Sequence, residues 1–218
     1  MSDERDRALQ ARETMVAKQL RARGIADERI LRVMAELPRE AFVPDRPGQA
    51  YEDGAVPIPA GQTISQPYVV ARMTELLRPK PGDLVLEVGT GSGYQAAVLA
   101  ALGCRVISYE RQPELANTAG ARLARLGLGD RVDVRLGDGS TGDAADGPFD
   151  GIIVTAAAPR LPESLRRQLA QGARLVIPVG PRDHQDLLVV ERTVDGWREW
   201  SDGAVVFVPL VGAAGYPG

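Results

Sequence analysis

The residues from Leu84 to Gly93, Leu-Val-Leu-Glu-Val-Gly-Thr-Gly-Ser-Gly, carry the strongest local signal for chemistry in the chain. An apolar run leads into three alternating glycines, Gly89, Gly91 and Gly93, and then into a helical pattern. Glycine lets a backbone turn sharply and approach a ligand closely, and the N-terminus of the following helix favours anions. The dinucleotide fingerprint needs its third glycine three places after the second. Tyr94 stands at that place, so the spacing argues against NAD.

Two acidic residues follow the next two apolar runs. Glu110 ends the first of them, 19 positions after Gly91 (110 minus 91). A carboxylate at this place can accept both hydroxyls of a ribose, although alone it fits a solvated strand end equally well. Asp138 follows the second run within Gly137-Asp138-Gly139. Taken alone, this segment is a common Asp-Gly turn, so its meaning depends on the glycine loop.

Gly-x-Gly-x-Gly preceded by an acidic residue, Glu87, resembles the first motif of S-adenosylmethionine-dependent methyltransferases of the Rossmann-like class. The alternative is a strand–helix turn that needs its glycines for packing alone. The resemblance implies that Glu87 lies near the charged amino-acid end of the cofactor and that Glu110 binds its ribose. It implies that Asp138 reaches the adenine amino group and that Gly139 contacts the ring. The loop residues would then also bind the cofactor: Gly89, Thr90, Gly91, Ser92 and Gly93.

Further blocks narrow the resemblance. Gly61-Gln-Thr-Ile-Ser-Gln-Pro67 is, alone, an N-cap pattern, because Ser65 precedes a helix with proline in its first turn. Together with Pro38-Arg-Glu-Ala-Phe-Val-Pro44, it resembles the protein-L-isoaspartate O-methyltransferase family. Three later blocks match in family order: 154–159 (Val-Thr-Ala-Ala-Ala-Pro), 175–180 (Leu-Val-Ile-Pro-Val-Gly) and 206–210 (Val-Phe-Val-Pro-Leu). The match runs from about residue 14 to residue 211, so it says little about the C-terminal tail.

This resemblance implies methyl transfer from S-adenosylmethionine to the free carboxylate of an isoaspartyl residue in a damaged protein or peptide. S-adenosylhomocysteine is then the product, and the ester promotes succinimide closure and return towards aspartate. The resemblance also implies that Thr63 and Ile64 line the site beside the cofactor and that Ser65 is the catalytic serine. The segment 206–209, with Val206 and Val208, would help to hold the extended backbone of the substrate.

The residue chemistry is compatible with this reaction. An α-carboxyl titrates at about 3.3–3.7, so the acceptor is ionised at neutral pH, and the sulfonium methyl group is already activated. No general base or metal is required, which agrees with one histidine, His184, and one cysteine, Cys104. We expect His184 on a surface loop and Cys104 in the core. Ser65, at a helix N-terminus, is suited to orient a carboxylate rather than to attack.

Composition places the chain among soluble globular proteins. It has 218 residues, of which 44% are hydrophobic and 25% charged. A net charge of −3 argues against binding nucleic acid through its phosphates. No apolar run approaches the ~18–20 residues of a membrane span, residues 1–12 are too charged for a signal peptide, and one cysteine makes no internal disulfide. We therefore expect a monomer in the cytoplasm.

The elements that position these residues alternate along the second part of the chain. Strands are predicted at 83–88, 105–109, 131–135, 149–154 and 173–179, and helices at 94–102, 113–126 and 162–170. This alternation predicts an α/β fold with a doubly wound, mostly parallel Rossmann-like sheet. Residues 187–192 and 204–210 should add an antiparallel edge hairpin, with a turn near Asp195-Gly196.

The first part of the chain is expected to add helices and a loop to this core. Leu9, Val16 and Leu20 share a helical face that ends near Gly24, and Asp27 can cap a second helix. Its apolar stripe holds Ile30, Val33, Met34 and Leu37, and Pro38 stops it. Residues 42–63 predict a long ordered loop or a short ribbon, and a third helix follows Ser65. We expect one domain over 1–218, with an extension at about 5–78 and a cofactor-binding core at about 79–218.

Two other functions fit parts of this pattern. A methyltransferase could act on a small molecule or a nucleic acid, but Thr155-Ala-Ala-Ala-Pro159 replaces the Asn-Pro-Pro-Tyr-like motif of amino-methylating DNA enzymes. A binding module could keep the cofactor fold without catalysis, but Ser65 and the glycine loop are intact. Labelled-methyl transfer to an isoaspartyl peptide, beside its aspartyl twin, separates the three functions.

Overall fold

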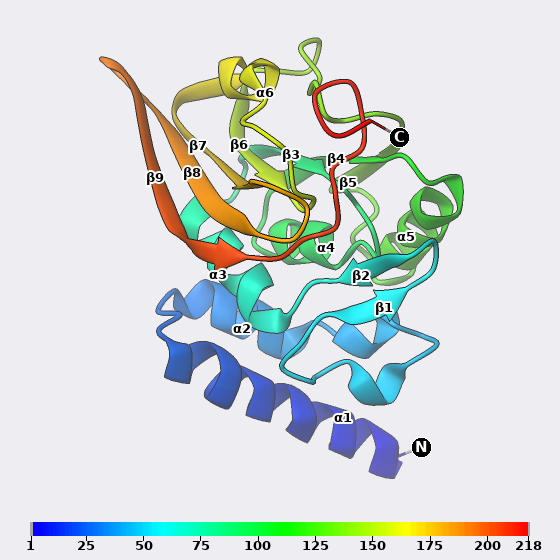
Figure 1. The fold of residues 1–218 in the computed structure, drawn as a ribbon. Helices are drawn as coiled ribbons and strands as arrows, with labels where there is room; N and C mark the ends of the chain where they lie inside the picture. Colours follow the sequence, from blue (N-terminus) through cyan, green and yellow to red (C-terminus); the bar gives the residue numbers. More distant parts are fainter. Residues whose placement is uncertain (1, 218) are drawn as a thin grey trace.

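A seven-stranded sheet in the order β5-β4-β3-β6-β7-β8-β9 forms the centre of the computed structural model, which describes residues 2–217 (Figure 1). Its strands are β3 (Leu84–Val88), β4 (Arg105–Glu110), β5 (Val132–Leu136), β6 (Phe149–Val154), β7 (Leu169–Val179), β8 (Gln185–Thr193) and β9 (Gly196–Val205). The pairs from β5 to β7 are parallel, and β8 and β9 add an antiparallel edge. The predicted fold class is confirmed.

The strand order reverses beside β3, which lies between β4 and β6. From β3 the chain moves outward to β4 and β5, then crosses back to β6 on the other side. In open α/β sheets, ligands bind outside the carboxyl ends of the strands at such a reversal. The residues that follow Val88 and Val154 therefore occupy the place where a ligand is expected.

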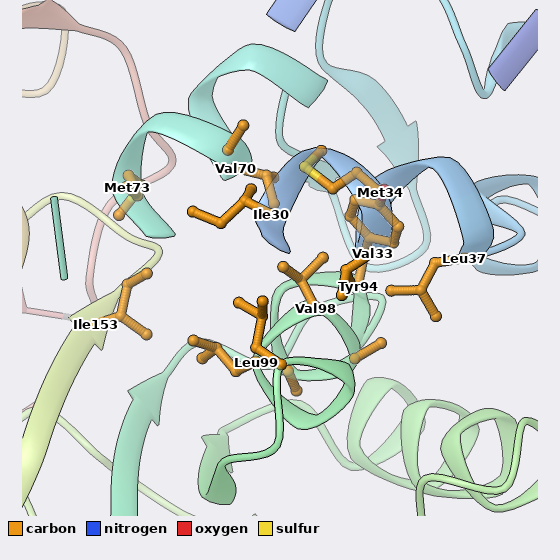
Figure 2. Packing of buried hydrophobic residues seen from close by; sticks show 14 of the residues in the cluster. Ile30, Val33, Met34, Leu37, Val70, Met73, Tyr94, Val98, Leu99 and Ile153 are labelled. Carbon is orange, nitrogen blue, oxygen red and sulfur yellow. The ribbon is translucent and has the colours of Figure 1, made fainter. Parts of the chain in front are cut away.

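Apolar side chains cover both faces of the sheet. On one face, strand residues such as Val85 and Ile153 pack against α2 (Glu28–Glu36), α3 (Pro67–Leu77) and α4 (Tyr94–Ala101). Figure 2 shows side chains of these helices meeting, among them Ile30, Val70 and Val98. The other helices are α5 (Pro113–Arg125), beside β4 and β5, and α6 (Glu163–Arg167), whose Leu165 is buried in the cluster on the other face. No helix within residues 2–217 is long and apolar enough to cross a membrane.

The N-terminal part adds α1 (Ser2–Met15), which continues through a π-helical turn, η1 (Val16–Leu20), and a 3-10 turn, η2 (Arg21–Arg23). The helix ends at Gly24, whose φ of 92° is left-handed, as predicted. Leu20 is buried, but Leu9 is 48% exposed, so the apolar face is buried only towards the end of this helix. Asp27 caps α2 by accepting the N–H of Arg29 at 2.9 Å, which confirms the predicted cap.

The Pro- and Gly-rich segment contains the short ribbon that was one of the two predictions. Two 3-10 turns, η3 (Arg39–Phe42) and η4 (Pro47–Gln49), lead to the antiparallel strands β1 (Val56–Ile58) and β2 (Gln62–Ile64). β2 ends directly before Ser65, and α3 begins two residues later at Pro67. The ribbon therefore carries the Ser65 segment to the carboxyl edge of the sheet.

Two predicted elements were wrong. β9 spans Gly196–Val205 instead of 204–210, because the tight turn pairs Gly196 directly with Thr193. β9 is an edge strand with mostly exposed side chains, so its sequence lacks the alternating apolar residues by which a strand is usually predicted. The apolar residues after it leave the sheet edge and bond to Ala157 instead. The predicted helix 162–170 shrinks to α6, because Leu169 already pairs with Phe149 as part of β7.

Candidate active site

A cleft lies at the carboxyl ends of β3, β4 and β6, where the strand order reverses. Its open space, counted out to solvent, is about 1020 Å³. The glycine loop, the ends of β4 and β5, and the segments 62–65 and 208–211 line it.

The glycine loop owes its shape to left-handed backbone. Gly89, Gly91 and Gly93 have φ values of 102°, 53° and 87°. A Cβ on Gly89 would lie 2.4 Å from Oγ1 of Thr155, so only glycine fits there. Gly89, Thr90, Gly91 and Ser92 line the cleft. Gly93 is the N-cap of α4, where its missing side chain leaves room for Ala119, and it is not among the residues that line the cleft.

Glu110 lies against this loop. It is 6% exposed, and one of its oxygens accepts the N–H of Gly91 at 2.8 Å. Its other oxygen accepts the N–H of Gln112 at 2.9 Å. The alternative of a solvated strand end is therefore wrong. Each carboxylate oxygen keeps a second lone pair, and Glu110 lines the cleft, so it can also accept hydroxyl groups of a ligand.

Asp138 lies at another end of the cleft, between Gly137 and Gly139. Its carboxylate accepts the N–H of Ser140 at 2.9 Å and that of Ala213 at 2.7 Å. Partial burial acts to raise the pKa of Asp138, but these hydrogen bonds outweigh it and hold the pKa below its usual range. Asp138 is thus an ionised acceptor, and the C-terminal segment bonds to it directly.

Glu87 is placed differently from the other predicted cofactor residues. It is fully buried and does not line the cleft, whereas the next residue, Val88, does. The hydroxyl of Ser108 donates to one carboxyl oxygen of Glu87, and Ser108 shares a second hydrogen bond, of 2.6 Å, with the hydroxyl of Thr90. The other oxygen of Glu87 has no partner among the described residues. Burial raises the pKa of Glu87 to about 8, so this carboxyl is largely protonated at neutral pH.

Ser65 lines the cleft together with Thr63 and Ile64. Gln66, not Ser65, is the N-cap residue of α3, so the interpretation of Ser65 as a plain helix cap is wrong. The carbonyl of Ser65 accepts a hydrogen bond of 2.7 Å from Arg39. Among residues 2–217, the hydroxyl of Ser65 has no hydrogen-bond partner, so it can bind a ligand.

The segment after β9 completes the wall. Val208 accepts the N–H of Ala157, and the N–H of Leu210 bonds to the carbonyl of Ala157, both at 2.8 Å. Val208, Pro209, Leu210 and Val211 line the cleft. Val206, predicted to contact the substrate, is 76% exposed and lies outside this lining.

The sequence did not single out several residues that line the cleft. Tyr109, Arg111 and Gln112 surround Glu110 at the end of β4, and Thr155 and Ala156 follow β6. Their signal was available, because Tyr109 ends a predicted strand of the parallel sheet and the others follow such a strand at its carboxyl end. Tyr94 and Gln95 of α4 also line the cleft, and of these two Gln95 had a signal, because it is polar in an otherwise apolar helix.

The residues present fit an adenosyl cofactor. The cleft combines a glycine cradle, the buried carboxylate of Glu110 and the acceptor Asp138. A Cβ on Gly139 would lie 2.6 Å from Cβ of Tyr109, so the backbone at this end of the cleft is tightly packed. Hydroxyl and amino groups of a ligand would find acceptors at Glu110 and Asp138.

Comparison with known proteins gives the family. A model of the protein-L-isoaspartate(D-aspartate) O-methyltransferase family matches residues 10–215. The chain belongs to this family. The protein-L-isoaspartate O-methyltransferase of Methanoculleus marisnigri is 50% identical over 216 residues, which cover 99% of this chain and 98% of the relative. That of Methylorubrum populi is 53% identical over 210 residues, covering 94% and 98%.

Solved structures of the protein-L-isoaspartate O-methyltransferase family share the fold. One matches with a TM-score of 0.81 at 27% identity and covers 94% of this chain and 67% of that chain. The Plasmodium falciparum member, in complex with S-adenosyl-L-homocysteine, matches with a TM-score of 0.77 at 28% identity, covering 92% and 98%. Because each match covers more than 90% of this chain, the similarity extends beyond the core to the helices before the sheet and to the C-terminal hairpin.

Proposed function

We propose that this chain is a protein-L-isoaspartate O-methyltransferase, which transfers the methyl group of S-adenosylmethionine to the free carboxylate of isoaspartyl residues in damaged proteins and peptides. The observation that carries the proposal is the composition of one cleft. The same cleft is lined by the glycine loop with Glu110 and by Ser65, whose hydroxyl is free to bind an acceptor. Family membership over residues 10–215 supports the reaction and the cofactor.

The cofactor's place follows from the acceptors in the cleft. When bound, S-adenosylmethionine supplies an activated sulfonium methyl group. Glu110 would accept the ribose hydroxyls with the lone pairs that Gly91 and Gln112 leave free. Asp138 would accept from the adenine amino group, beside Gly139. Thr90 would face the cofactor, and Ser108 connects the hydroxyl of Thr90 to the carboxyl of Glu87. Glu87 would therefore act on the site only through the hydroxyls of Ser108 and Thr90.

The acceptor needs placement rather than activation. Its carboxylate is ionised at neutral pH, so no proton has to be removed before the methyl group moves. The hydroxyl of Ser65 would donate a hydrogen bond to one carboxylate oxygen and leave the other directed at the methyl group. The chain around Val208 would hold the peptide next to Ser65. The backbone of this part of the chain is itself hydrogen-bonded to Ala157. Holding reactants in line is a large part of such catalysis.

Labelled-methyl transfer tests the function. An isoaspartyl peptide and its aspartyl twin differ only in which carboxylate is free. We expect transfer to the isoaspartyl peptide and none above background to the twin. Equal labelling of both peptides, or labelling of neither while S-adenosylhomocysteine still binds, would contradict the proposal. The second of these results would instead favour a binding module.

The role of Ser65 is tested by Ser65→Ala. We expect the variant to keep its melting temperature and its affinity for S-adenosylhomocysteine, and to lose roughly a hundredfold in turnover, the cost of misplacing a reacting group by about 1 Å. Ser65→Thr should also be impaired, because its added methyl group crowds the acceptor. Ser164→Ala, on α6 outside the cleft, is the matched control and should turn over normally. Normal turnover of Ser65→Ala would remove Ser65 from the site.

We also propose that the chain folds as one domain and acts as a monomer in the cytoplasm. The glycine loop, Glu110, Asp138 and Ser65 of one chain all line the same cleft, which supports a site within a single chain. The one cysteine, Cys104, is a buried free thiol, which suits a reducing compartment. Analytical ultracentrifugation should give the mass of one chain, 23.3 kDa. A dimer at micromolar concentration would contradict this part of the proposal.

A further inference from the structure

Arg39 is a fully buried cation that holds the Ser65 segment. It begins the turn η3, and its relative exposure is 0%. Its Nε donates to the carbonyl of Ala50 at 2.6 Å, and Nη2 donates to the carbonyl of Ser65 at 2.7 Å. One guanidinium thus ties the backbone of Ser65 to a part of the chain 15 residues earlier (65 minus 50).

A second buried arginine binds the glycine loop in the same manner. Arg122 lies on α5, and its Nη1 donates to the carbonyl of Ser92 at 2.6 Å. Ser92 and Ser65 both line the cleft, and the proposed function assigns Ser92 to the cofactor and Ser65 to the acceptor. The two arginines therefore each hold a backbone carbonyl of one wall of the cleft.

An aromatic pair lies between the two arginines. Phe42 and Tyr94 meet edge to face, with ring centroids 5.1 Å apart and an interplanar angle of 71°. The guanidinium of Arg39 lies 4.7 Å from the ring centroid of Tyr94, and that of Arg122 lies 5.8 Å from the ring centroid of Phe42. Tyr94 is the first residue of α4 and packs among apolar side chains of α2 (Figure 2). The rings thus join the two cations through a rigid contact.

Neither arginine has the partner that a buried charge normally has. Among residues 2–217, neither Arg39 nor Arg122 forms an ion pair with a carboxylate, and one terminal nitrogen of Arg39 has no hydrogen-bond partner. Burial lowers the pKa of both guanidinium groups, a sign that desolvation disfavours their charge. Buried charges are costly unless they are paired, so packing alone does not account for these two. Each of them instead donates to the backbone carbonyl of a residue that lines the cleft, Ser65 for Arg39 and Ser92 for Arg122.

We propose that Arg39 and Arg122 are positioning residues, of which Arg39 holds the backbone of the Ser65 segment and Arg122 holds the backbone of the glycine loop, with the Phe42–Tyr94 pair packed between them. This inference rests on the proposed function, because it assigns the Ser65 wall to the acceptor and the Ser92 wall to the cofactor. The position of Ser65 matters for turnover because methyl transfer depends on how the acceptor is placed, whereas the shape of the glycine loop matters for binding the cofactor. Arginine suits this task because its planar fork binds carbonyls while its face stacks on a ring.

Arg39→Lys tests the acceptor side. Lysine keeps the charge, but its single ammonium group cannot serve both carbonyls and stack on Tyr94. Because a misplacement of about 1 Å costs roughly a hundredfold, we expect kcat for an isoaspartyl peptide to fall at least about tenfold. The Kd for S-adenosylhomocysteine, measured by calorimetry, should stay within about twofold. Arg39→Gln, which keeps one amide donor without the charge, is the second variant if Arg39→Lys does not fold.

A double-mutant cycle with Ser65→Ala separates positioning from a general loss of stability. If Arg39 acts through Ser65, the double variant should turn over no more than about threefold more slowly than Ser65→Ala alone, because coupled residues are not additive. Losses that multiply would overturn the role of Arg39. If Ser65→Ala alone turned over normally, the proposed role of Ser65 would fall and Arg39 with it, but the test of Arg122 would be unaffected.

Arg122→Lys tests the cofactor side and gives the opposite pattern. We expect the Kd for S-adenosylhomocysteine to rise at least about fivefold, with kcat at saturating cofactor within about threefold of the parent value. Arg174→Lys is the matched control, because Arg174 is also buried, donates to the carbonyl of Leu76 at 3.0 Å and stacks on Trp200, outside the cleft lining. It should lower only the melting temperature. If all three lysine variants changed stability alone, or changed kcat and Kd alike, the proposal would be overturned.

Discussion

The carboxylate of Glu110 accepts the backbone N–H of Gly91 at 2.8 Å, so the end of β4 holds the turn that follows β3. The same side chain lines the cleft. One carboxylate therefore shapes the glycine loop and is available to a ligand. A substitution of Glu110 therefore affects both the shape of the glycine loop and the binding of a ligand, and an experiment has to separate these two effects.

Glu110→Ala should weaken the binding of S-adenosylhomocysteine at least about tenfold. A hydrogen bond to a charged group contributes roughly 1.5–3 kcal/mol, and about 1.4 kcal/mol corresponds to one decade in affinity. Calorimetry with S-adenosylhomocysteine and its 2′-deoxy analogue distinguishes the two roles of Glu110. The parent protein should prefer the hydroxylated ligand, and Glu110→Ala should lose this preference. A preference that survives in the folded variant would mean that Glu110 only shapes the loop.

Gly212→Ala should weaken cofactor binding through Asp138. A Cβ at this position would lie 2.2 Å from one oxygen of Asp138, so the carboxylate or the C-terminal segment has to move. The hydrogen bond of 2.7 Å between Ala213 and Asp138 would be strained as well. We expect the Kd for S-adenosylhomocysteine to rise about tenfold, the order of losing one hydrogen bond to a charged group. Gly48→Ala, whose Cβ meets nothing within 4 Å, is the control, and equal affinities of the two variants would refute the link.

Glu87→Gln should change how stability depends on pH. Burial raises the pKa of Glu87 from 4.5 to about 8, so between these values the folded state holds a proton that the unfolded chain releases. The contribution of this carboxyl is complete at low pH and is lost as pH rises towards 8, by up to about 1.4 kcal/mol per pH unit. Urea unfolding should therefore show that the stability of Glu87→Gln relative to the parent increases from about pH 5 to pH 8. A relative stability that is flat over this range would contradict the raised pKa.

Much of the site was predictable because its signals are local. The glycine loop was predictable from an apolar strand followed by three glycines and a helix. The position of Glu110 at the carboxyl end of a strand followed from the order of the strands. Glu87 was expected near the amino-acid end of the cofactor, and the structure places its carboxyl in the interior, outside the cleft lining. Neighbouring residues on a strand face opposite ways, so Glu87 and Val88 cannot both face the same cleft.

Other features had no sequence signal. Arg39 stands in a polar and turn-rich stretch, where an arginine is ordinarily solvated, and only tertiary packing encloses it. The bounds of β9 were predicted wrongly because an edge strand with exposed faces lacks the apolar alternation that marks buried strands. The C-terminal segment contacts Asp138 across 75 residues of sequence (213 minus 138), a relationship that no local pattern contains.

Cys104 should be unreactive in the folded protein. Burial raises the pKa of its thiol to about 12, and the thiolate is the species that alkylating reagents attack. We expect iodoacetamide to label the native protein at about pH 8 at least about a hundredfold more slowly than the urea-unfolded chain. Mass spectrometry gives both rates. Comparable rates would show that the thiol is accessible and ionisable in the native state.

His184→Gln should keep most of the activity, because the reaction needs no general base. His184 is the only histidine in the sequence, and it lies exposed in the loop between β7 and β8, outside the cleft lining. Within the cleft, burial raises the pKa of Tyr94 and Tyr109 above the usual tyrosine value, while the pKa of Asp138 is lowered, so these groups do not titrate near neutral pH. Turnover at saturating substrates should therefore be flat between about pH 6 and pH 7.5, below the pKa of Glu87, in both the parent and the variant. A fall in kcat of about a hundredfold in folded His184→Gln with normal cofactor affinity, or a bell-shaped profile that the variant abolishes, would show that this histidine moves a proton after all.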